Sequence, residues 1–136
     1  MQANEITLTV DETNDGVTTA DVDHVFSRFE ETLNRSVYIG PSHAIASRNT
    51  LSLHRSFPTT NGNFRGVQKT SFKFTRDMAV DGVDGVSTLT APMIVEVKIS
   101  IPVGVTSADI LLQRQVALSL LDRDDIMGPL NEQLMI

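Results

Sequence analysis

The feature that most constrains the fold is the order in which two hydrophobic periods follow one another along the chain. Residues 50–54, 69–75 and 93–101 alternate apolar and polar side chains with a period of two, as half-buried strands do. After Pro102 the pattern changes, and residues 110–121 are apolar at most positions, which is typical of a helix with a wide apolar surface. Strands that come first and helices that come last predict an α+β fold, with helices covering one face of an antiparallel sheet.

The N-terminal third of the chain predicts a hairpin and a short strand. Residues 5–10 alternate, and residues 11–16 contain the Asp, Asn and Gly residues that favour a turn. Residues 17–33 fit both a strand and a helical stripe, and we favour a strand, which completes an N-terminal hairpin. Residues 36–39 predict a short strand that ends at Gly40-Pro41.

The second half of the chain predicts a long loop and two helical segments. Residues 77–92 are rich in Gly, Asp and Val and predict a loop. Thr106 is a suitable N-cap for the helix, with Asp109 in the first turn. Gly128-Pro129 is expected to break or bend the chain, before a last short helical turn over residues 130–135.

The helix over residues 110–121 has more apolar surface than a helix on its own small sheet needs. Only Gln113, Arg114, Gln115 and Ser119 interrupt the apolar residues. This excess predicts burial from two sides, as at an obligate dimer interface. We therefore expect Leu112, Val116 and Leu120 to lie at a subunit interface.

Charge is strongly segregated along the chain, although the net charge of −6 over 136 residues is unremarkable. Residues 1–31 and 77–136 are both acidic. Residues 32–76 contain seven Lys and Arg residues and no Asp or Glu. One interpretation is chance combined with surface solubility. The other is a local anion-binding surface inside a globally acidic protein.

The polar positions of the three alternating stretches define a candidate binding face. They carry hydroxyl groups and all three lysines of the protein, which together form a donor-rich cationic platform of the kind that phosphate oxygens bind. An ordinary solvent-exposed face of Thr, Ser and Lys is the competing interpretation. The candidate positions on this face include Thr50, Ser52, His54, Lys69, Ser71, Lys73, Glu96 and Lys98.

Enzyme signatures are lacking in the sequence. There is no Cys, the three histidines show no metal-binding spacing, and no phosphate-binding or nucleophile motif occurs. The acidic pairs at residues 21–23 and 122–125 lack the other ligands of a calcium loop. We expect no catalytic residues, no metal and no cofactor. No apolar run is long enough to predict a membrane span.

The junction between the last strand and the helix, residues 97–112 (VKISIPVGVTSADILL), resembles that of coat proteins of the small single-stranded RNA bacteriophages, the levivirus type. The order of predicted elements is similar over nearly all of the chain. The resemblance implies one coat-protein domain over residues 1–136, mainly β in 1–102 and helical in 106–136. It also implies an interlocked homodimer, in which two C-terminal helices pack on the partner's sheet and the two sheets join edge to edge.

The resemblance further implies that dimers assemble into an icosahedral shell around single-stranded RNA, in virions formed in the bacterial cytoplasm. The polar sheet face would look inward and bind RNA hairpins, with possible repression of translation, through the eight positions named above. The family commonly has an Arg and an aromatic residue where this chain has His54 and Ile94. A dimeric regulatory or ligand-binding α+β domain without a shell is the alternative from another class, and a small enzyme is a third.

Overall fold

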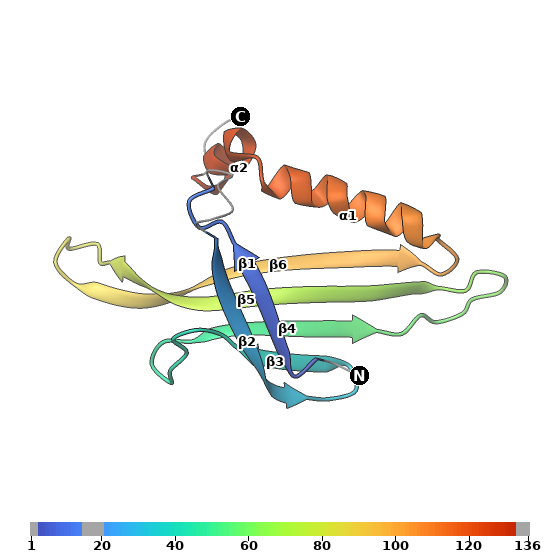
Figure 1. Cartoon of the computed structure of the whole chain (residues 1–136), viewed down its shortest axis with the longest axis horizontal. Coiled ribbons are helices and arrows are strands. Elements are labelled where there is room, and N and C mark those ends of the chain that lie inside the picture. Colours follow the sequence, from blue (N-terminus) through green and yellow to red (C-terminus); the bar gives the residue numbers. More distant parts are fainter. Residues whose placement is uncertain (1–2, 15–20, 133–136) are drawn as a thin grey trace. The chain divides into compact units, whose positions relative to one another are not determined.

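The computed structural model has six strands followed by two helices, and it describes residues 3–14 and 21–132 (Figure 1). The predicted α+β class is therefore confirmed. The predicted turn at residues 11–16 and the last helical turn at 130–135 extend beyond the described residues. The strands are β1 (Glu5–Val10), β2 (Val22–Glu31), β3 (Arg35–Ile39), β4 (Asn49–Ser56), β5 (Val67–Asp81) and β6 (Thr88–Pro102), and the helices are α1 (Ser107–Leu121) and α2 (Asp124–Asn131).

The strands form a single sheet in which each strand pairs with the next one in sequence, in the order β1-β2-β3-β4-β5-β6. The four pairs from β1 to β5 have defined antiparallel registers. Residues 22–31 form strand β2, which confirms for these residues the strand that we favoured over a helix in the segment 17–33. A register shift between Arg28 and Glu30 interrupts the pairing of β2 with β3, and such a bulge bends a strand.

The hairpin of β1 and β2 crosses the longer strands and packs on their apolar face (Figure 1). The rings of Phe26 in β2 and Phe74 in β5 pack edge to face, with centroids 5.8 Å apart. Two strands separate β2 from β5 in the sheet order, so this contact requires the hairpin to fold over the sheet. Tyr38 and Leu51 complete the buried cluster with Phe26, and Leu53 and Phe72 pack against it.

The folded hairpin depends on close contacts just before β1 and in the middle of β2. Tyr38 is fully buried, and its hydroxyl donates a hydrogen bond to the carbonyl of Ala3 at 2.8 Å. A Cβ atom on Gly40 would lie 2.6 Å from the Phe26 ring and 2.9 Å from the Asn49 side chain. Glycine at position 40 therefore makes room for the aromatic core, in addition to ending β3.

The predicted loop over residues 77–92 is much shorter in the structure. Strand β5 continues to Asp81 and β6 begins at Thr88, so only six residues separate them. The alternation of Met78 and Val80 and the β-branched residues after Ser87 extend the two strands. Asp77, a residue type that is typical of loops, is accommodated in the strand because its carboxylate pairs with Arg48.

Two helices follow the sheet as predicted, but the second one is α2 at Asp124–Asn131, earlier than the helical turn predicted at residues 130–135. Helix α2 continues through Gly128 and Pro129 to Asn131, so the expected break is wrong. Proline removes the hydrogen bond that its N–H would donate four residues back, here to the carbonyl of Asp125. Asp125 is exposed, so water can replace that donor. Neither helix is long and apolar enough to cross a membrane.

Helix α1 begins as the sequence predicts. The Thr106 hydroxyl accepts a hydrogen bond from the backbone N–H of Asp109 at 3.2 Å and donates one to its carboxylate at 2.7 Å. We expect Thr106→Ala to lower the free energy of unfolding by about 1 kcal/mol, because both of these hydrogen bonds at the helix start are lost. Urea denaturation measures this loss, with Ser107→Ala as the control. Equal effects of the two substitutions would show that the cap contributes nothing specific.

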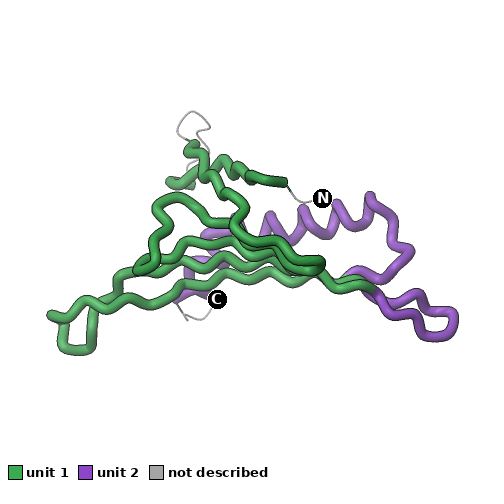
Figure 2. Tube along the Cα trace, turned by 90° about the horizontal axis from the view of Figure 1, so that it is seen from below, with its two compact units in different colours: residues 1–57, 68–100 green, residues 58–67, 101–136 purple. Residues whose placement is uncertain are grey.

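The chain divides into two compact units, coloured separately in Figure 2. Unit 1 comprises residues 1–57 and 68–100 and includes the N-terminal hairpin and most of the sheet. Unit 2 comprises residues 58–67 and 101–136 and includes both helices. The division groups the β4–β5 connection with the helices, where Val103 N–H donates to the carbonyl of Gly66 at 3.0 Å. A single coat-protein domain over residues 1–136 remains a prediction.

Candidate nucleic-acid interface

The strand registers place the predicted polar side chains of β4 and β5 on one face of the sheet. Directly opposed residues of antiparallel strands point to the same face. Ser52 lies opposite Lys73, and His54 lies opposite Ser71. The same register continues the face at both ends, where Thr50 lies opposite Thr75 and Ser56 lies opposite Lys69. We call this surface the polar face.

Strand β6 adds the remaining predicted side chains to the polar face. Lys98 lines a shallow depression of about 340 Å³ together with His54, Lys69 and Ser71. The ammonium group of Lys98 lies 3.6 Å from the carboxylate of Glu96, two residues earlier in the strand. All three lysines therefore belong to this face, on adjacent strands.

The cations of the polar face are available to a ligand. Within the described part of the chain, neither Lys69 nor Lys73 forms an ion pair. The side chain of Lys98 is 74% exposed beside Glu96. An exposed pair of this kind contributes little to stability, so Lys98 can exchange Glu96 for an anionic ligand at small cost.

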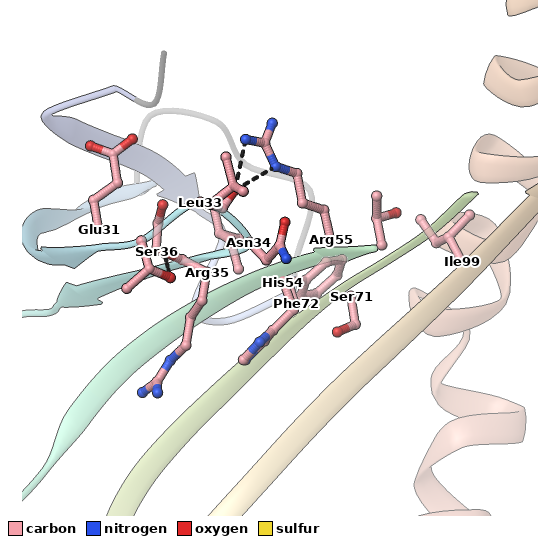
Figure 3. A pocket seen from close by; sticks show the side chains of 13 residues that line it. Glu31, Leu33, Asn34, Arg35, Ser36, His54, Arg55, Ser71, Phe72 and Ile99 are labelled. Atoms are coloured by element: carbon pink, nitrogen blue, oxygen red, sulfur yellow. Dashed lines mark hydrogen bonds between the residues drawn. The ribbon is translucent and has the colours of Figure 1, made fainter. Parts of the chain in front are cut away.

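Arg35 belongs to the polar face but was not among the predicted site residues. It lies opposite His54 in the β3–β4 register. Figure 3 shows the side chains of Arg35, His54 and Ser71 on one side of the strands, with Arg55 on the other. The sequence contained a signal for this placement, because Arg35, Val37 and Ile39 occupy alternate positions and so share one face of a strand. The strand is too short, however, for its pattern alone to show which residues of the neighbouring strands lie opposite it.

Two arginines of the acid-free segment have structural roles instead. The Nε and Nη2 atoms of Arg48 donate to the two carboxylate oxygens of Asp77, both at 3.1 Å. Hydrogen bonds from the Arg48 side chain and backbone hold the pKa of Asp77 below its ordinary value. Arg55 donates to the carbonyl of Leu33 at 3.0 and 2.8 Å, at the edge of a 270 Å³ pocket (Figure 3).

The predicted interface residues lie on one side of α1 and are accessible in the single chain. Leu112, Val116 and Leu120 are spaced four residues apart, and they are 59%, 57% and 50% exposed. No residue of α1 is buried. Large apolar surfaces of this kind usually mark interaction sites.

The β5–β6 loop, residues 82–87, is an ordered turn with an apolar tip. The Asp84 carboxylate accepts hydrogen bonds from the Ser87 hydroxyl at 2.6 Å and from the backbone N–H groups of Ser87 and Val86 at 2.9 and 3.0 Å. These bonds lower the pKa of Asp84 to about 2. Val83 and Val86 are almost fully exposed at the same turn.

Solved structures with the same fold are subunits of virus-like particles. The virus-like particle of bacteriophage AVE019 matches with a TM-score of 0.77 at 20% identity, over 100% of this chain and 99% of the other. This chain has the levi-like particle-protein fold. The virus-like particle of Wenzhou levi-like virus 4 matches at 19% identity over 93% of this chain and 83% of the other, with a TM-score of 0.69.

A further match extends over the whole of this chain. The virus-like particle of Beihai levi-like virus 21 matches 100% of this chain and 98% of the other, with a TM-score of 0.71 at 13% identity. No protein-family model and no curated protein sequence matches the chain. The likeness of fold over the whole chain confirms the resemblance seen in residues 97–112.

Proposed function

We propose that this chain is the coat subunit of a levi-like virus, which forms homodimers that assemble into a shell around single-stranded RNA. The observation that carries this proposal is the likeness over essentially the full length to proteins solved as virus-like particles. On this basis the subunit has a structural and not an enzymatic role, and its location is the virion.

Dimer formation is supported by apolar surface that the single chain leaves exposed. Leu112, Val116 and Leu120 each keep at least half of their surface accessible along α1. A monomer would hold this row of side chains in water, whereas a partner's sheet would cover it. The two helices of each subunit would then pack on the sheet of the other subunit.

RNA binding is supported by the chemistry of the polar face. Three lysines, Arg35 and several hydroxyl groups lie on adjacent strands, and a two-fold dimer would double each of them. Ammonium and guanidinium groups neutralise phosphates, and hydroxyl groups can reach base edges in unpaired loops. Ile94 is 50% exposed on the same strand as Lys98 but offers no aromatic surface for stacking on a base. Recognition would therefore depend on hairpin shape, phosphates and hydroxyl contacts.

Expression of the protein alone, followed by electron microscopy, tests the shell directly. Uniform hollow particles of the size of a small virus are the expected result. A soluble dimer that never forms particles would instead favour the alternative, a dimeric regulatory or ligand-binding domain. Repression of translation belongs to the same proposal, and a reporter gene behind candidate hairpins of the cognate RNA tests it.

The β5–β6 loop is expected to contact neighbouring dimers in the shell. Deletion of Val83-Asp84-Gly85 removes one of the two exposed valines of the loop and the carboxylate that orders the turn. We expect dimers to persist, because the loop lies outside the α1 surface, while particle size or yield changes. Light scattering of dimers and microscopy of particles measure the two effects. Particles identical to those of the parent protein in size and stability would show that the loop has no role in assembly.

A further inference from the structure

His54 lies at the centre of the cations of the polar face. The β3–β4 register places Arg35 directly opposite His54, and the β4–β5 register places Ser71 opposite it on the other side. Lys69 and Lys73 come two residues before and two residues after Ser71, so they are the diagonal neighbours of His54 on β5. A single imidazole is therefore bordered by cations on both adjacent strands.

The surroundings of His54 are open to a ligand. His54 is exposed, and it lines the depression of about 340 Å³ together with Lys69 and Lys98. Arg55 also lines this depression, but its side chain lies on the other side of the strands, where it donates to the carbonyl of Leu33 (Figure 3). An anion that enters the depression therefore meets the imidazole and ammonium groups together.

Two carboxylates belong to the surroundings of His54, and each already has a cationic partner. Glu96 lies 3.6 Å from Lys98. Glu31 lines the 270 Å³ pocket beside His54, and its carboxylate pairs with Arg28 at 2.7 Å. Among the residues that the structure describes, His54 itself forms no ion pair. A bound phosphate would therefore supply the anionic partner that a protonated His54 lacks here.

We propose that RNA binding at the polar face takes up protons from solvent at His54, so that affinity rises as the pH falls from 8 to 5.5. This inference rests on the RNA binding proposed above and specifies how that binding is regulated. Histidine is the only side chain whose ordinary charge change falls between pH 5 and 8. A phosphate beside it favours the imidazolium form, because opposite charges attract and because the imidazolium donates a charge-assisted hydrogen bond.

The direction of the effect follows from which state binds more protons. In the complex, His54 would have phosphates beside it, whereas its neighbours in the free protein are mainly cations. The complex therefore binds more protons than the free protein, and linkage makes its affinity fall as the pH rises. Lysine and arginine side chains ordinarily stay charged over this range, so Arg35, Lys69, Lys73 and Lys98 contribute affinity without pH dependence.

Filter binding of an RNA hairpin at pH 5.5 and at pH 8, at one ionic strength, measures the effect. The probe has a fully paired stem and a loop of uridines, so that its own bases bind no protons in this range. We expect affinity at pH 5.5 to exceed that at pH 8 by about tenfold for each His54 that contacts the hairpin. Titration calorimetry in two buffers of different ionisation enthalpy should find proton uptake that peaks at about half a proton per contact.

Two substitutions at position 54 fix its charge in opposite states. His54→Gln is neutral at every pH and should bind about tenfold more weakly than the parent at pH 5.5. His54→Lys is charged throughout and should bind at pH 8 about as tightly as the parent does at pH 5.5. Both variants should lose the pH dependence. His24→Gln in β2 and His43→Gln in the β3–β4 loop are the controls, and both should keep it.

The outcomes separate this inference from the proposed function. RNA binding of equal affinity at both pH values, or a pH dependence that survives in His54→Gln, would overturn the role of His54 and leave RNA binding in place. Calorimetry of the parent protein needs no substitution, and binding without proton uptake would overturn the inference in the same way. A parent protein that binds the hairpin at neither pH would overturn the proposed RNA interface itself.

Discussion

Leu120→Asp is expected to abolish soluble protein instead of merely shifting its assembly. Leu120 is 50% exposed in the single chain and lies in the row that Leu112 and Val116 continue. In the proposed dimer this row is covered by the partner. A carboxylate placed there would be buried without a cation, which costs several kcal/mol, in addition to the roughly 2–5 kcal/mol lost with a buried leucine side chain.

The control places the same carboxylate on the opposite side of the same helix. Arg114 is exposed and lies about 160° around α1 from Val116, the middle of the row. Arg114→Asp should remain soluble and dimeric, which excludes a general effect of negative charge on α1. Soluble yield, circular dichroism and light scattering compare the two variants. A well-folded, monodisperse Leu120→Asp monomer would contradict the proposed interface.

The triple variant Lys69, Lys73 and Lys98→Ala is expected to lose most of its affinity for RNA. A dimer would lose six positive charges from its polar face, and each phosphate contact with single-stranded RNA contributes about 0.7 to the salt dependence. The slope of log affinity against log salt should therefore flatten by about 4, and affinity at low salt should fall by about a hundredfold or more. Filter binding at several salt concentrations measures both quantities.

Matched single variants decide whether RNA affinity depends on the position of a positive charge on the polar face or only on the net charge of the protein. Lys73 and Arg76 lie in the same strand, but the register places Arg76 opposite Asn49, on the other face of the sheet. Lys73→Ala should weaken binding across RNA sequences, while Arg76→Ala should change it little. Thr50→Ala and Ser52→Ala should affect discrimination between hairpins more than total affinity. If the triple variant binds like the parent, Arg35 becomes the next candidate.

The alternating patterns predicted the polar face because β4 and β5 are long and bury one side. Thr50, Ser52 and His54 alternate with Leu51 and Leu53, so their common face follows from the period alone. Arg35 could not be assigned in this way, since β3 has only five residues and its apolar side chains Val37 and Tyr38 are neighbours that point to opposite faces of the sheet. So short a strand without a single apolar face does not show which of its sides is the polar one.

Contacts between distant parts of the chain were also outside what periodicity can predict. The packing of Phe26 on Phe74 depends on the hairpin folding across two intervening strands, and nothing local in either segment specifies it. The same limit explains the overestimated loop. Asp77 looks like a turn residue until Arg48, 29 positions earlier, is known to bind it.

The strand order has a consequence for how the protein is made. Because every strand pairs with the one before it in sequence, each step of sheet formation closes only a short segment, which favours rapid folding. The sheet can grow one strand at a time as the chain leaves the ribosome, and β6 and the helices are synthesised last. Strand β6, which ends the sheet order in the described part of the chain, is thus exposed only when the subunit is nearly complete, which shortens the period in which an unfinished chain could aggregate through its edge.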